Sequence, residues 1–263
     1  MELTGQHVFI TGGGSGIGLA LATALLQRGN RVTVCGRNPE KLLRAAQENP
    51  GLETLQVDLS REEGLQQIRT ELDGALKSVS ILVNNAAVGR AYSLLLDADA
   101  ACDLEAELAT NLMVPIRLTQ MFLPVLMARD RAAVVNMTSG FAVWPSAVVP
   151  GYSVAKGGLT AFSRILRNQL RETGVKVFEV QPPLVETDLV KEASARKMPP
   201  EKVAAIALAG IQRDHFEIRI GVVRLMPFCA GVVPWFLDWV LRRYPFKLKD
   251  LPRLYAPPGK NQR

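Results

Sequence analysis

The sequence has little of the residue types that build metal sites and disulfide frameworks. It contains three cysteines and two histidines in 263 residues, and Cys35, Cys102 and Cys229 form no C-x-x-C pair. An odd number of scattered cysteines argues against a disulfide scaffold and a metal site, and it favours a reducing, cytoplasmic location. His7 and His215 lie far apart in the sequence. We interpret both as structural or surface residues, and we expect no metal.

A hydrophobic run long enough to cross a membrane is also missing. The most apolar stretch, residues 225–241 (LMPFCAGVVPWFLDWVL), contains Pro227, Pro234 and Asp238. It is therefore a poor transmembrane helix. No signal peptide is expected, because the N-terminus runs directly into a strand and a glycine loop.

Excess charge of one sign is missing from most of the chain. The net charge is +6, but seven Lys or Arg residues stand against one acid from position 242 onward, which leaves 24 basic and 24 acidic residues in positions 1–241. The basic tail therefore dominates the net charge. No other feature of the sequence supports a nucleic-acid partner.

Apolar β-rich runs alternate with longer helical patterns up to about residue 180. Several of these runs are continuously apolar, as expected for strands that are covered on both faces. The alternation predicts one α/β domain with a Rossmann-type, doubly wound parallel sheet over residues 1–224, and residues 225–263 form an apolar and then basic C-terminal extension. The predicted strands are 7–11, 31–35, 54–57, 81–83, 132–138 and 175–180, and the predicted helices are 16–28, 39–48, 61–76, 103–128 and 152–173.

A glycine-rich motif, TGGGSGIG at residues 11–18, follows the first predicted strand. Glycines permit a tight turn, and Gly16 and Gly18 permit close approach of backbone and helix. The following helix then points its N-terminus at a pyrophosphate. A plain tight turn is the alternative, but the position between a strand and a helix favours a dinucleotide site.

The end of the second predicted strand lacks the carboxylate that an NAD site uses for the ribose 2′-hydroxyl. Arg37 stands there instead and offers a guanidinium group to a 2′-phosphate, so NADP(H) is favoured over NAD(H). A surface arginine at a turn is the alternative. Ser15 adds a candidate hydrogen bond to the same phosphate. Asp58, after the third strand, is either an acceptor for the adenine amino group or a carboxylate at a helix N-terminus, and Asn84 is expected to fasten neighbouring loops.

The stretch from Ser139 to Lys156 carries the candidate chemistry. Tyr152 and Lys156 are four residues apart, so they lie on one face of a helix. An ammonium 4 Å away favours a phenolate by about 4 kcal/mol at an effective dielectric near 20, or roughly three pKa units. Such a tyrosine could exchange protons near neutral pH, and Ser139 could hold a carbonyl or alcohol oxygen against it. Taken alone, most such pairs are solvated helix faces.

With these motifs in order, residues 5–190 resemble the short-chain dehydrogenase/reductase family in its common single-domain form. The resemblance rests on TGGGSGIG, Asp58, NNAA at 84–87, Asn111, Ser139 and YSVAK at 152–156. It implies that Tyr152 exchanges the proton, Lys156 lowers the pKa of Tyr152 and binds the nicotinamide ribose, Ser139 holds the substrate oxygen and Asn111 positions a relay water. The implied cofactor-binding residues are Gly12, Gly14, Ser15, Gly16, Ile17, Gly18, Arg37, Asp58, Asn85, Ala86, Tyr152, Lys156, Pro182 and Thr187.

The segment QPPLVETD at 181–188 departs from the family pattern at one position. Pro183 replaces the usual glycine and stiffens the backbone beside the expected nicotinamide site, whereas Thr187 matches the residue expected to bind the carboxamide. Together with EIRIG at 217–221, this segment looks like the bacterial subgroup that includes the oxidoreductase of teichoic-acid D-alanylation operons.

The resemblance implies an NADP(H)-dependent reductase or dehydrogenase acting on a small-molecule carbonyl or alcohol. Its pocket is expected to be apolar, which favours a lipophilic substrate; the candidate pocket residues are Phe141, Val143, Trp144, Val148, Leu184 and Leu189. Two alternatives are an NADP-binding regulatory or scaffold protein and an NADP-using epimerase or dehydratase, which would normally need a longer domain after residue 190.

Three interpretations remain for the C-terminal extension. It covers the substrate pocket or a partner subunit, it lies on a membrane surface with Trp235 and Trp239 at the headgroups, or it binds nucleic acid. The first interpretation is favoured over a peripheral membrane contact, and nucleic acid comes last. The family resemblance further implies a homodimer or homotetramer formed through the helices predicted at 103–128 and 152–173.

Overall fold

A seven-stranded parallel sheet forms the centre of the structure, a computed structural model that describes residues 1–187 and 197–228. The strand order is β3-β2-β1-β4-β5-β6-β7, and every neighbouring pair is parallel. The order reverses direction next to β1, which is the switch point where such sheets bind ligands. The strands are β1 His7–Thr11, β2 Arg31–Gly36, β3 Leu52–Gln56, β4 Ile81–Asn84, β5 Ala132–Met137, β6 Val175–Gln181 and β7 Glu217–Arg219.

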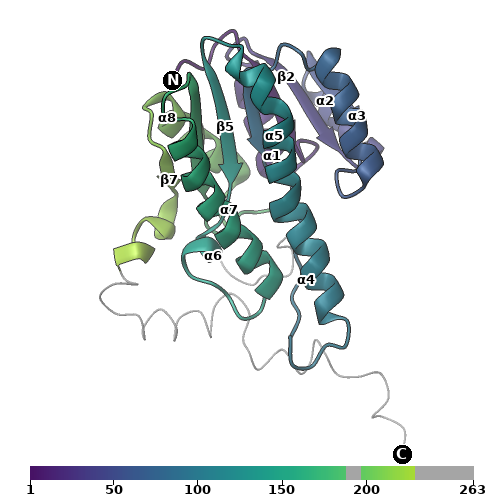
Figure 1. Ribbon diagram of the computed structural model, residues 1–263, viewed down its shortest axis with the longest axis vertical. Coiled ribbons are helices and arrows are strands. Elements are labelled where there is room, and N and C mark those ends of the chain that lie inside the picture. The colour runs from purple at the N-terminus through teal and green to yellow at the C-terminus, as the bar shows by residue number, and fades with distance from the viewer. Residues whose placement is uncertain (188–196, 229–263) are drawn as a thin grey trace, which may run out of the picture.

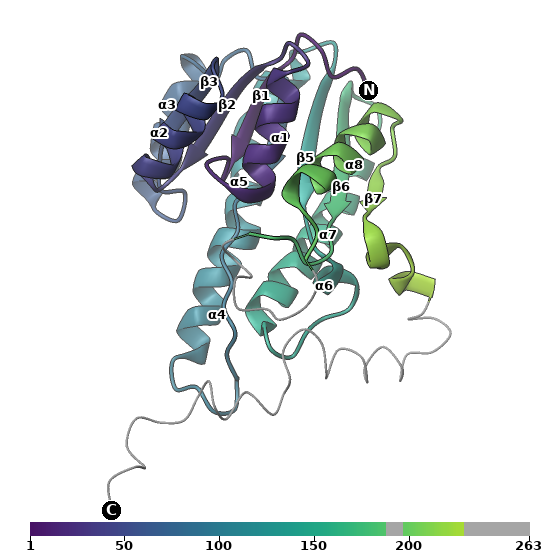
Figure 2. The same cartoon turned by 180° about the vertical axis from the view of Figure 1, so that it is seen from behind.

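Helices cover both faces of this sheet (Figures 1 and 2). One core cluster joins α1, α2 and α8 to one face of the strands, and a second joins α3, α5 and α7 to the other face. Alternate residues of a strand belong to opposite clusters: Val8 and Ile10 pack on the first side and Phe9 on the second. The helices are α1 Gly16–Leu26, α2 Pro39–Glu48, α3 Glu62–Asp73, α4 Ala100–Leu108, α5 Val114–Met127, α6 Gly140–Val143, α7 Pro150–Gln169 and α8 Pro200–Gln212.

These observations confirm the predicted α/β class with a doubly wound parallel sheet. The continuous apolar runs become strands such as β5, in which all six residues are buried. Among the described residues, the prediction missed β7, α8, the short helix α6 and a 3-10 turn at Gly221–Arg224. The alternation of strand and helix therefore continues beyond residue 180.

The long helix predicted at 103–128 forms over residues 100–127, but it is not α-helical throughout. The chain instead forms α4, a π-helical turn at Ala109–Met113, and α5. Pro115 explains the interruption, because proline has no amide hydrogen for the carbonyl four residues earlier, that of Asn111. The Val114 amide donates to the Ala109 carbonyl, five residues back. The π-helical turn contains Asn111.

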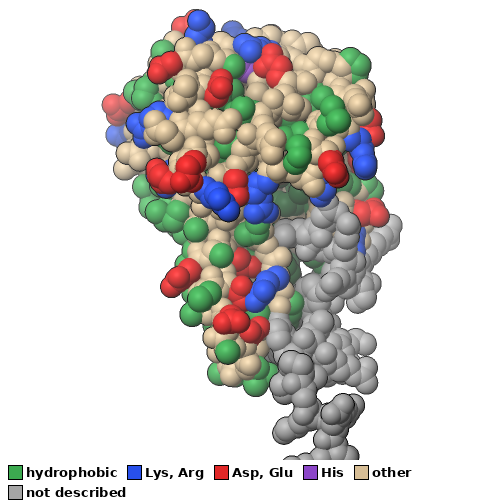
Figure 3. All heavy atoms as spheres, turned by 90° about the vertical axis from the view of Figure 1, so that its right-hand side faces the viewer, with side chains coloured by type: hydrophobic (Ala, Val, Ile, Leu, Met, Phe, Trp, Pro, Cys, Tyr) green, Lys and Arg blue, Asp and Glu red, His purple; other side chains and the backbone are tan. Residues whose placement is uncertain are grey.

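The arm formed by α4 and the loop before it projects away from the sheet (Figures 1 and 2). In the space-filling view the same arm extends below the body of the molecule, and hydrophobic side chains lie at its tip (Figure 3). No helix in the described ranges is long and apolar enough to cross a membrane. The predictions for Leu189, Trp235, Trp239 and most of the C-terminal extension concern residues outside the described ranges.

Candidate active site

The glycine loop between β1 and α1 packs against the end of β4. Gly12 has φ +67°, and a Cβ placed there would lie 2.8 Å from the Ala86 Cα. A Cβ on Gly18 would lie 2.4 Å from the Gly12 carbonyl oxygen. The Asn85 side-chain amide donates to the Thr11 carbonyl at 2.9 Å and to the Gly12 carbonyl at 3.2 Å. Larger residues would therefore disrupt both the turn and its attachment to β4.

The start of α1 faces the segment that follows β6. A Cβ on Gly16, which has φ +56°, would lie 2.9 Å from the Thr187 Cγ2. Ser15 occupies the N-cap position, and its side chain makes no cap hydrogen bond to the amides of α1. The fold thus brings Ser15, Gly16 and Thr187 together at one helix N-terminus, where the backbone dipole favours an anion. Ile17 is different, because it packs against the buried core.

Arg37 lies exposed between β2 and α2, whereas Asp58 lies in the turn before α3. The Asp58 Oδ1 accepts from the Ser60 hydroxyl at 2.6 Å and from the Ser60 amide at 3.0 Å. These hydrogen bonds with Ser60, aided by the nearby charges of Arg37 and Arg61, hold the pKa of Asp58 below its usual value. The Asp58 carboxylate therefore stabilises the turn before α3 and makes no cap hydrogen bond to that helix, whose N-cap residue is Arg61.

These residues fit a bound dinucleotide. The glycine cradle leaves no room for side chains, and the start of α1 presents backbone amides beside it. At the end of β2 the loop carries the Arg37 guanidinium and no carboxylate. The donor groups at this edge of the sheet therefore suit phosphate.

Ser139, Tyr152 and Lys156 come together at the end of β5 and the start of α7. A hydrogen bond joins Ser139 and Tyr152, and the Ser139 Oγ also accepts from the Phe141 amide at 3.1 Å. The Lys156 Nζ lies 5.6 Å from the centroid of the Tyr152 ring and donates to the Met137 carbonyl at 2.8 Å. The sequence prediction that these three side chains are neighbours is confirmed.

The predicted effect of Lys156 on Tyr152 is wrong for the protein without cofactor. Burial raises the pKa of Tyr152 to about 12, although the hydrogen bond with Ser139 opposes this rise. Burial also lowers the pKa of Lys156 to about 8. The ammonium group donates to the Met137 carbonyl and lies beside the tyrosine ring. Desolvation therefore outweighs the attraction on which the prediction was based.

Asn111 attaches the loop after β4 to the π-helical turn. Its side chain is fully buried; the Oδ1 accepts from the Val88 amide at 2.8 Å, and the Nδ2 donates to the Val88 carbonyl at 2.7 Å. The α-helical hydrogen bond to the Asn111 carbonyl cannot form, because its donor would be Pro115. The Asn111 carbonyl is therefore without its α-helical donor, and the side chain binds Val88.

Asn84 fastens the sheet beneath the site. Its Nδ2 donates to the Asn136 Oδ1 at 2.8 Å and to the Thr119 Oγ1 at 3.2 Å, and Asn136 in turn donates to Ser163 at 2.8 Å. These bonds join β4, β5, α5 and α7. The predicted fastening role of Asn84 agrees with these contacts, and Asn85 shares it through the glycine loop.

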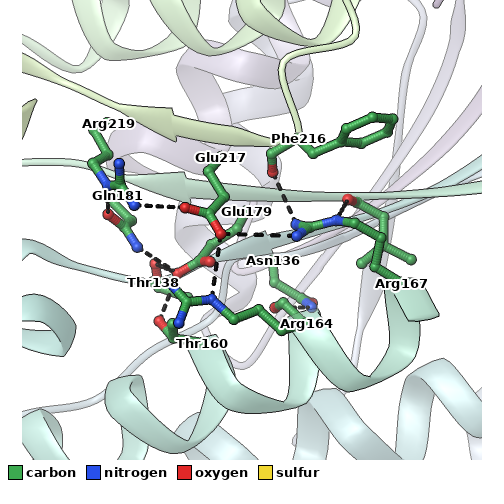
Figure 4. Close-up of polar contacts among 12 residues, drawn as sticks. Asn136, Thr138, Thr160, Arg164, Arg167, Glu179, Gln181, Phe216, Glu217 and Arg219 are labelled. Carbon is green, nitrogen blue, oxygen red and sulfur yellow. Dashed lines mark hydrogen bonds and ion pairs between the residues drawn. The ribbon is translucent and has the colours of Figure 1, made fainter. Parts of the chain in front are cut away.

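A buried carboxylate, Glu179 on β6, joins three segments that carry site residues (Figure 4). Its Oε1 accepts from Thr138 at 3.0 Å, from Thr160 at 2.5 Å and from Gln181 at 2.7 Å. Thr138 precedes Ser139, Thr160 lies one turn after Lys156 on α7, and Gln181 precedes Pro182. The Pro182 carbonyl also accepts from the Gly140 amide at 3.1 Å. Glu179 therefore fixes the ends of β5 and β6 relative to α7.

Arginines surround the outer side of this cluster. Arg219 donates to Gln181 at 3.1 Å and to Glu217 at 2.5 Å, and Arg164 donates to Glu217 at 3.3 Å (Figure 4). The sequence analysis missed Glu179 as a structural hub. A charged residue between the apolar Phe178 and Val180 of β6 was the available signal, because a buried charge needs partners.

The predicted pocket residues do not all face the same surroundings. Phe141, Val143 and Trp144 are half-buried in and after α6, and Leu184 is half-buried after β6. Val148 is buried, and its carbonyl accepts from the Tyr92 amide at 3.1 Å. Val148 therefore packs in the interior, and α6 supplies most of the apolar surface beside Ser139.

Comparison with known proteins agrees with this arrangement. The short chain dehydrogenase family model matches residues 6–198. The uncharacterized oxidoreductase DltE of Bacillus subtilis is 38% identical over 83% of this chain and 89% of its own length. A very-long-chain 3-oxoacyl-CoA reductase of Macaca fascicularis is 30% identical over 79% of this chain and 70% of its own.

Solved structures show the same fold. A short chain dehydrogenase from Burkholderia cenocepacia in complex with NADP superposes with a TM-score of 0.81 at 22% identity, covering 92% of this chain and 99% of that one. A short chain dehydrogenase/reductase from Burkholderia phymatum in complex with NAD gives 0.77 at 21% identity, with coverages of 94% and 98%. With the family match over most of its length and this fold, the chain belongs to the short-chain dehydrogenase/reductase family of oxidoreductases.

Proposed function

We propose that this protein is an NADP(H)-dependent oxidoreductase that interconverts a lipophilic carbonyl and its alcohol, with Tyr152 as the general acid and base. The observation that carries the proposal is the meeting of three side chains at the sheet edge: Tyr152 is hydrogen-bonded to Ser139, and the Lys156 ammonium lies beside its ring. A regulatory or scaffold protein that only binds the cofactor has no use for this group.

The protonation of Tyr152 suits carbonyl reduction. Burial raises its pKa to about 12, so the phenol carries its proton at neutral pH. Ser139 holds the substrate oxygen while Tyr152 gives that oxygen a proton. Lys156 holds the nicotinamide ribose, and the Asn111 carbonyl holds a water for proton resupply. When bound, the nicotinamide supplies or accepts the hydride.

The other cofactor contacts follow from the glycine cradle. The amides of residues 12–18, including Gly14 and Ser15, would hold the pyrophosphate at the N-terminus of α1. Ala86 packs beside Gly12, and Pro182 and Thr187 lie on the nicotinamide side. Asn85 acts by holding the loop, and Asp58 lies near the adenine.

The preference for NADP(H) is tested by changing Arg37. We expect Arg37→Gln to weaken NADPH binding about 10- to 100-fold, because a charge-assisted hydrogen bond contributes about 1.5–3 kcal/mol. NADH binding should change by less than about twofold, because NADH has no 2′-phosphate. Cofactor titrations followed by fluorescence measure both.

Arg44→Gln is the matched control for this prediction, since Arg44 is an exposed arginine on the neighbouring helix α2. It should leave both affinities unchanged. Equal losses for NADPH and NADH in Arg37→Gln would remove Arg37 from phosphate recognition.

A lipophilic substrate is supported by the half-buried apolar residues of α6, Phe141 and Val143, next to Ser139. The similarity to a very-long-chain 3-oxoacyl-CoA reductase points to the same class of substrate. We infer an aliphatic or aromatic ketone, aldehyde or secondary alcohol.

Contact with a membrane surface is proposed at the tip of the projecting arm. Leu94, Leu95 and Leu96 are 60%, 93% and 66% exposed, which is uncommon for three consecutive leucines. The basic residues after position 241 would add attraction to anionic lipid. We further propose that the protein assembles as a homodimer or homotetramer. Apart from this membrane contact, its proposed location is the cytoplasm.

Vesicle flotation tests the membrane contact. We expect binding to phosphatidylglycerol vesicles that weakens with salt, and about tenfold weaker binding for Leu95→Ser, because burying one leucine contributes about 1.5–3 kcal/mol. Leu43→Ser, a change at another exposed leucine on α2, is the control and should bind like the wild type. Equal binding by all three proteins would exclude the leucine contact.

A further inference from the structure

Helix α7 carries Tyr152 in its first turn but does not cap its own N-terminus. Val149 occupies the N-cap position, and its side chain has no atom that can accept a hydrogen bond. The first amides of a helix have no partner within the helix and need an acceptor from elsewhere. The amides nearest Tyr152 therefore depend on another part of the chain.

Two side chains from distant segments supply these acceptors. The Tyr92 hydroxyl accepts from the Gly151 amide at 3.1 Å, and the Glu107 carboxylate of α4 lies beside the Tyr152 amide, which acts to lower the pKa of that carboxyl group against the rise caused by burial. The Tyr92 hydroxyl also donates to the Glu107 Oε2 at 3.3 Å. Glu107 is only 3% exposed and Tyr92 is fully buried, so water does not compete for these bonds. A carboxylate at a helix N-terminus is also favoured by the helix dipole.

The packing around Gly151 shows how closely these groups approach the helix. A Cβ on Gly151 would lie 2.3 Å from the Glu107 Oε2 and 2.5 Å from the Tyr92 hydroxyl. Any other residue at position 151 would displace both acceptors. The first turn of α7 is therefore built around the carboxylate of α4.

The Glu107 carboxylate also binds the loop that follows β4. Its Oε1 accepts from the Arg90 amide at 2.9 Å. Asn111, one turn further along, holds Val88 of the same loop. Glu107 thus links α7, which carries Tyr152, to the loop after β4. This link takes no direct part in proton transfer.

We propose that Glu107 is a positioning residue, which caps α7 from α4 and fixes Tyr152 relative to the loop at residues 88–92. This inference rests on the proposed function, since it assigns Glu107 to the orientation of the proposed proton donor. The charge of Glu107 has a second effect, because it opposes formation of the Tyr152 phenolate. The other groups facing Tyr152 are Ser139 and Lys156, while Arg90 and Tyr92 face Glu107.

The test compares Glu107→Gln with Asp103→Asn. The first change keeps the shape and one acceptor oxygen but removes the charge. The second removes a carboxylate on the same helix that pairs with Arg90 and makes no hydrogen bond or ion pair with α7 among the described residues. We expect Glu107→Gln to lower kcat about 10- to 100-fold and to leave the KM for NADPH within about twofold, since misplacing a catalytic group impairs the chemical step. Asp103→Asn should retain wild-type kinetics.

A pH profile separates positioning from a general loss of stability. For alcohol oxidation, which needs the phenolate, the midpoint should move to lower pH in Glu107→Gln by about 0.5 unit, because the opposing charge is gone. A purely structural role would leave this midpoint unchanged. An unchanged midpoint together with unchanged kcat would overturn the inference.

Hydrogen exchange tests the cap without requiring turnover. The Tyr152 amide should exchange about 10-fold faster in Glu107→Gln than in the wild type or Asp103→Asn, because the buried negative charge beside it is removed. Equal exchange in all three proteins would overturn the inference even if the protein is an active reductase. If the wild type shows no turnover, faster exchange would still support the cap while the proposed function fails.

If Glu107→Gln does not fold, Tyr92→Phe is the variant that replaces it in the exchange experiment. It removes the hydroxyl that accepts from Gly151 but leaves the carboxylate in place. Faster exchange confined to the first turn of α7 supports the cap, and wild-type exchange there contradicts it.

Discussion

Tyr152→Phe is expected to lower kcat about 10³-fold or more, at the upper part of the range for loss of a general acid or base. The change removes one hydroxyl, which is the group proposed to give a proton to the substrate oxygen. Steady-state oxidation of NADPH with a lipophilic ketone measures the loss.

Two controls show whether this loss is chemical. The affinity for NADPH should change by less than about threefold, and the thermal midpoint should shift by only a few degrees, since the ring and its packing remain. Turnover within about tenfold of the wild type would exclude Tyr152 as the proton donor.

Lys156→Met is expected to lower kcat/KM about 10²- to 10³-fold and to weaken NADPH binding, because it removes the ammonium proposed to hold the nicotinamide ribose. Lys156 is only 2% exposed, and its burial opposes its charge. Methionine fills a similar volume without the cost of burying a charge. We therefore expect the variant to fold with at least near-normal stability, so that the kinetic loss reflects the missing ammonium.

The same lysine predicts a pH dependence of cofactor binding. Burial lowers the pKa of Lys156 to about 8, so the group is charged below that pH and neutral above it in the free protein. Cofactor binding that needs the Lys156 ammonium has its full affinity below about pH 8. Above that pH the affinity should fall by up to tenfold per pH unit. Lys156→Met should show no such dependence. A wild-type affinity that stays constant up to about pH 10 would show that the ammonium is not used.

The parallel sheet could be predicted from sequence because buried strands leave a local signal. The apolar run at 132–137 needs no knowledge of distant contacts to be identified as a covered strand. The strand β7 has only three residues, Glu217–Arg219, two of them charged, and it is a strand because β6 pairs with it. The π-helical turn around Asn111 could in principle have been predicted, since Pro115 cannot donate a hydrogen bond to the Asn111 carbonyl. The apolar pattern on both sides indicated only one continuous helix.

The same distinction between local sequence signals and distant contacts applies to the candidate site. The positions of Ser139, Tyr152 and Lys156 follow from a family motif and from helix geometry. The pKa of Tyr152 does not, because it depends on how completely the fold excludes water from the phenol. Glu107 could not be found from sequence, because it reaches a helix that begins more than 40 residues later and looks like any helical glutamate.

Transfer of deuterium from cofactor to substrate tests the central claim most directly. The wild type is incubated in a single turnover with NADPH deuterated at nicotinamide C4 and a panel of lipophilic ketones and aldehydes, and the alcohols are analysed by mass spectrometry. We expect deuterium on the carbinol carbon of at least one product and none with Tyr152→Phe. Tight binding of NADPH with no labelled alcohol from any member of the panel would contradict the reductase account and favour a regulatory, cofactor-binding protein.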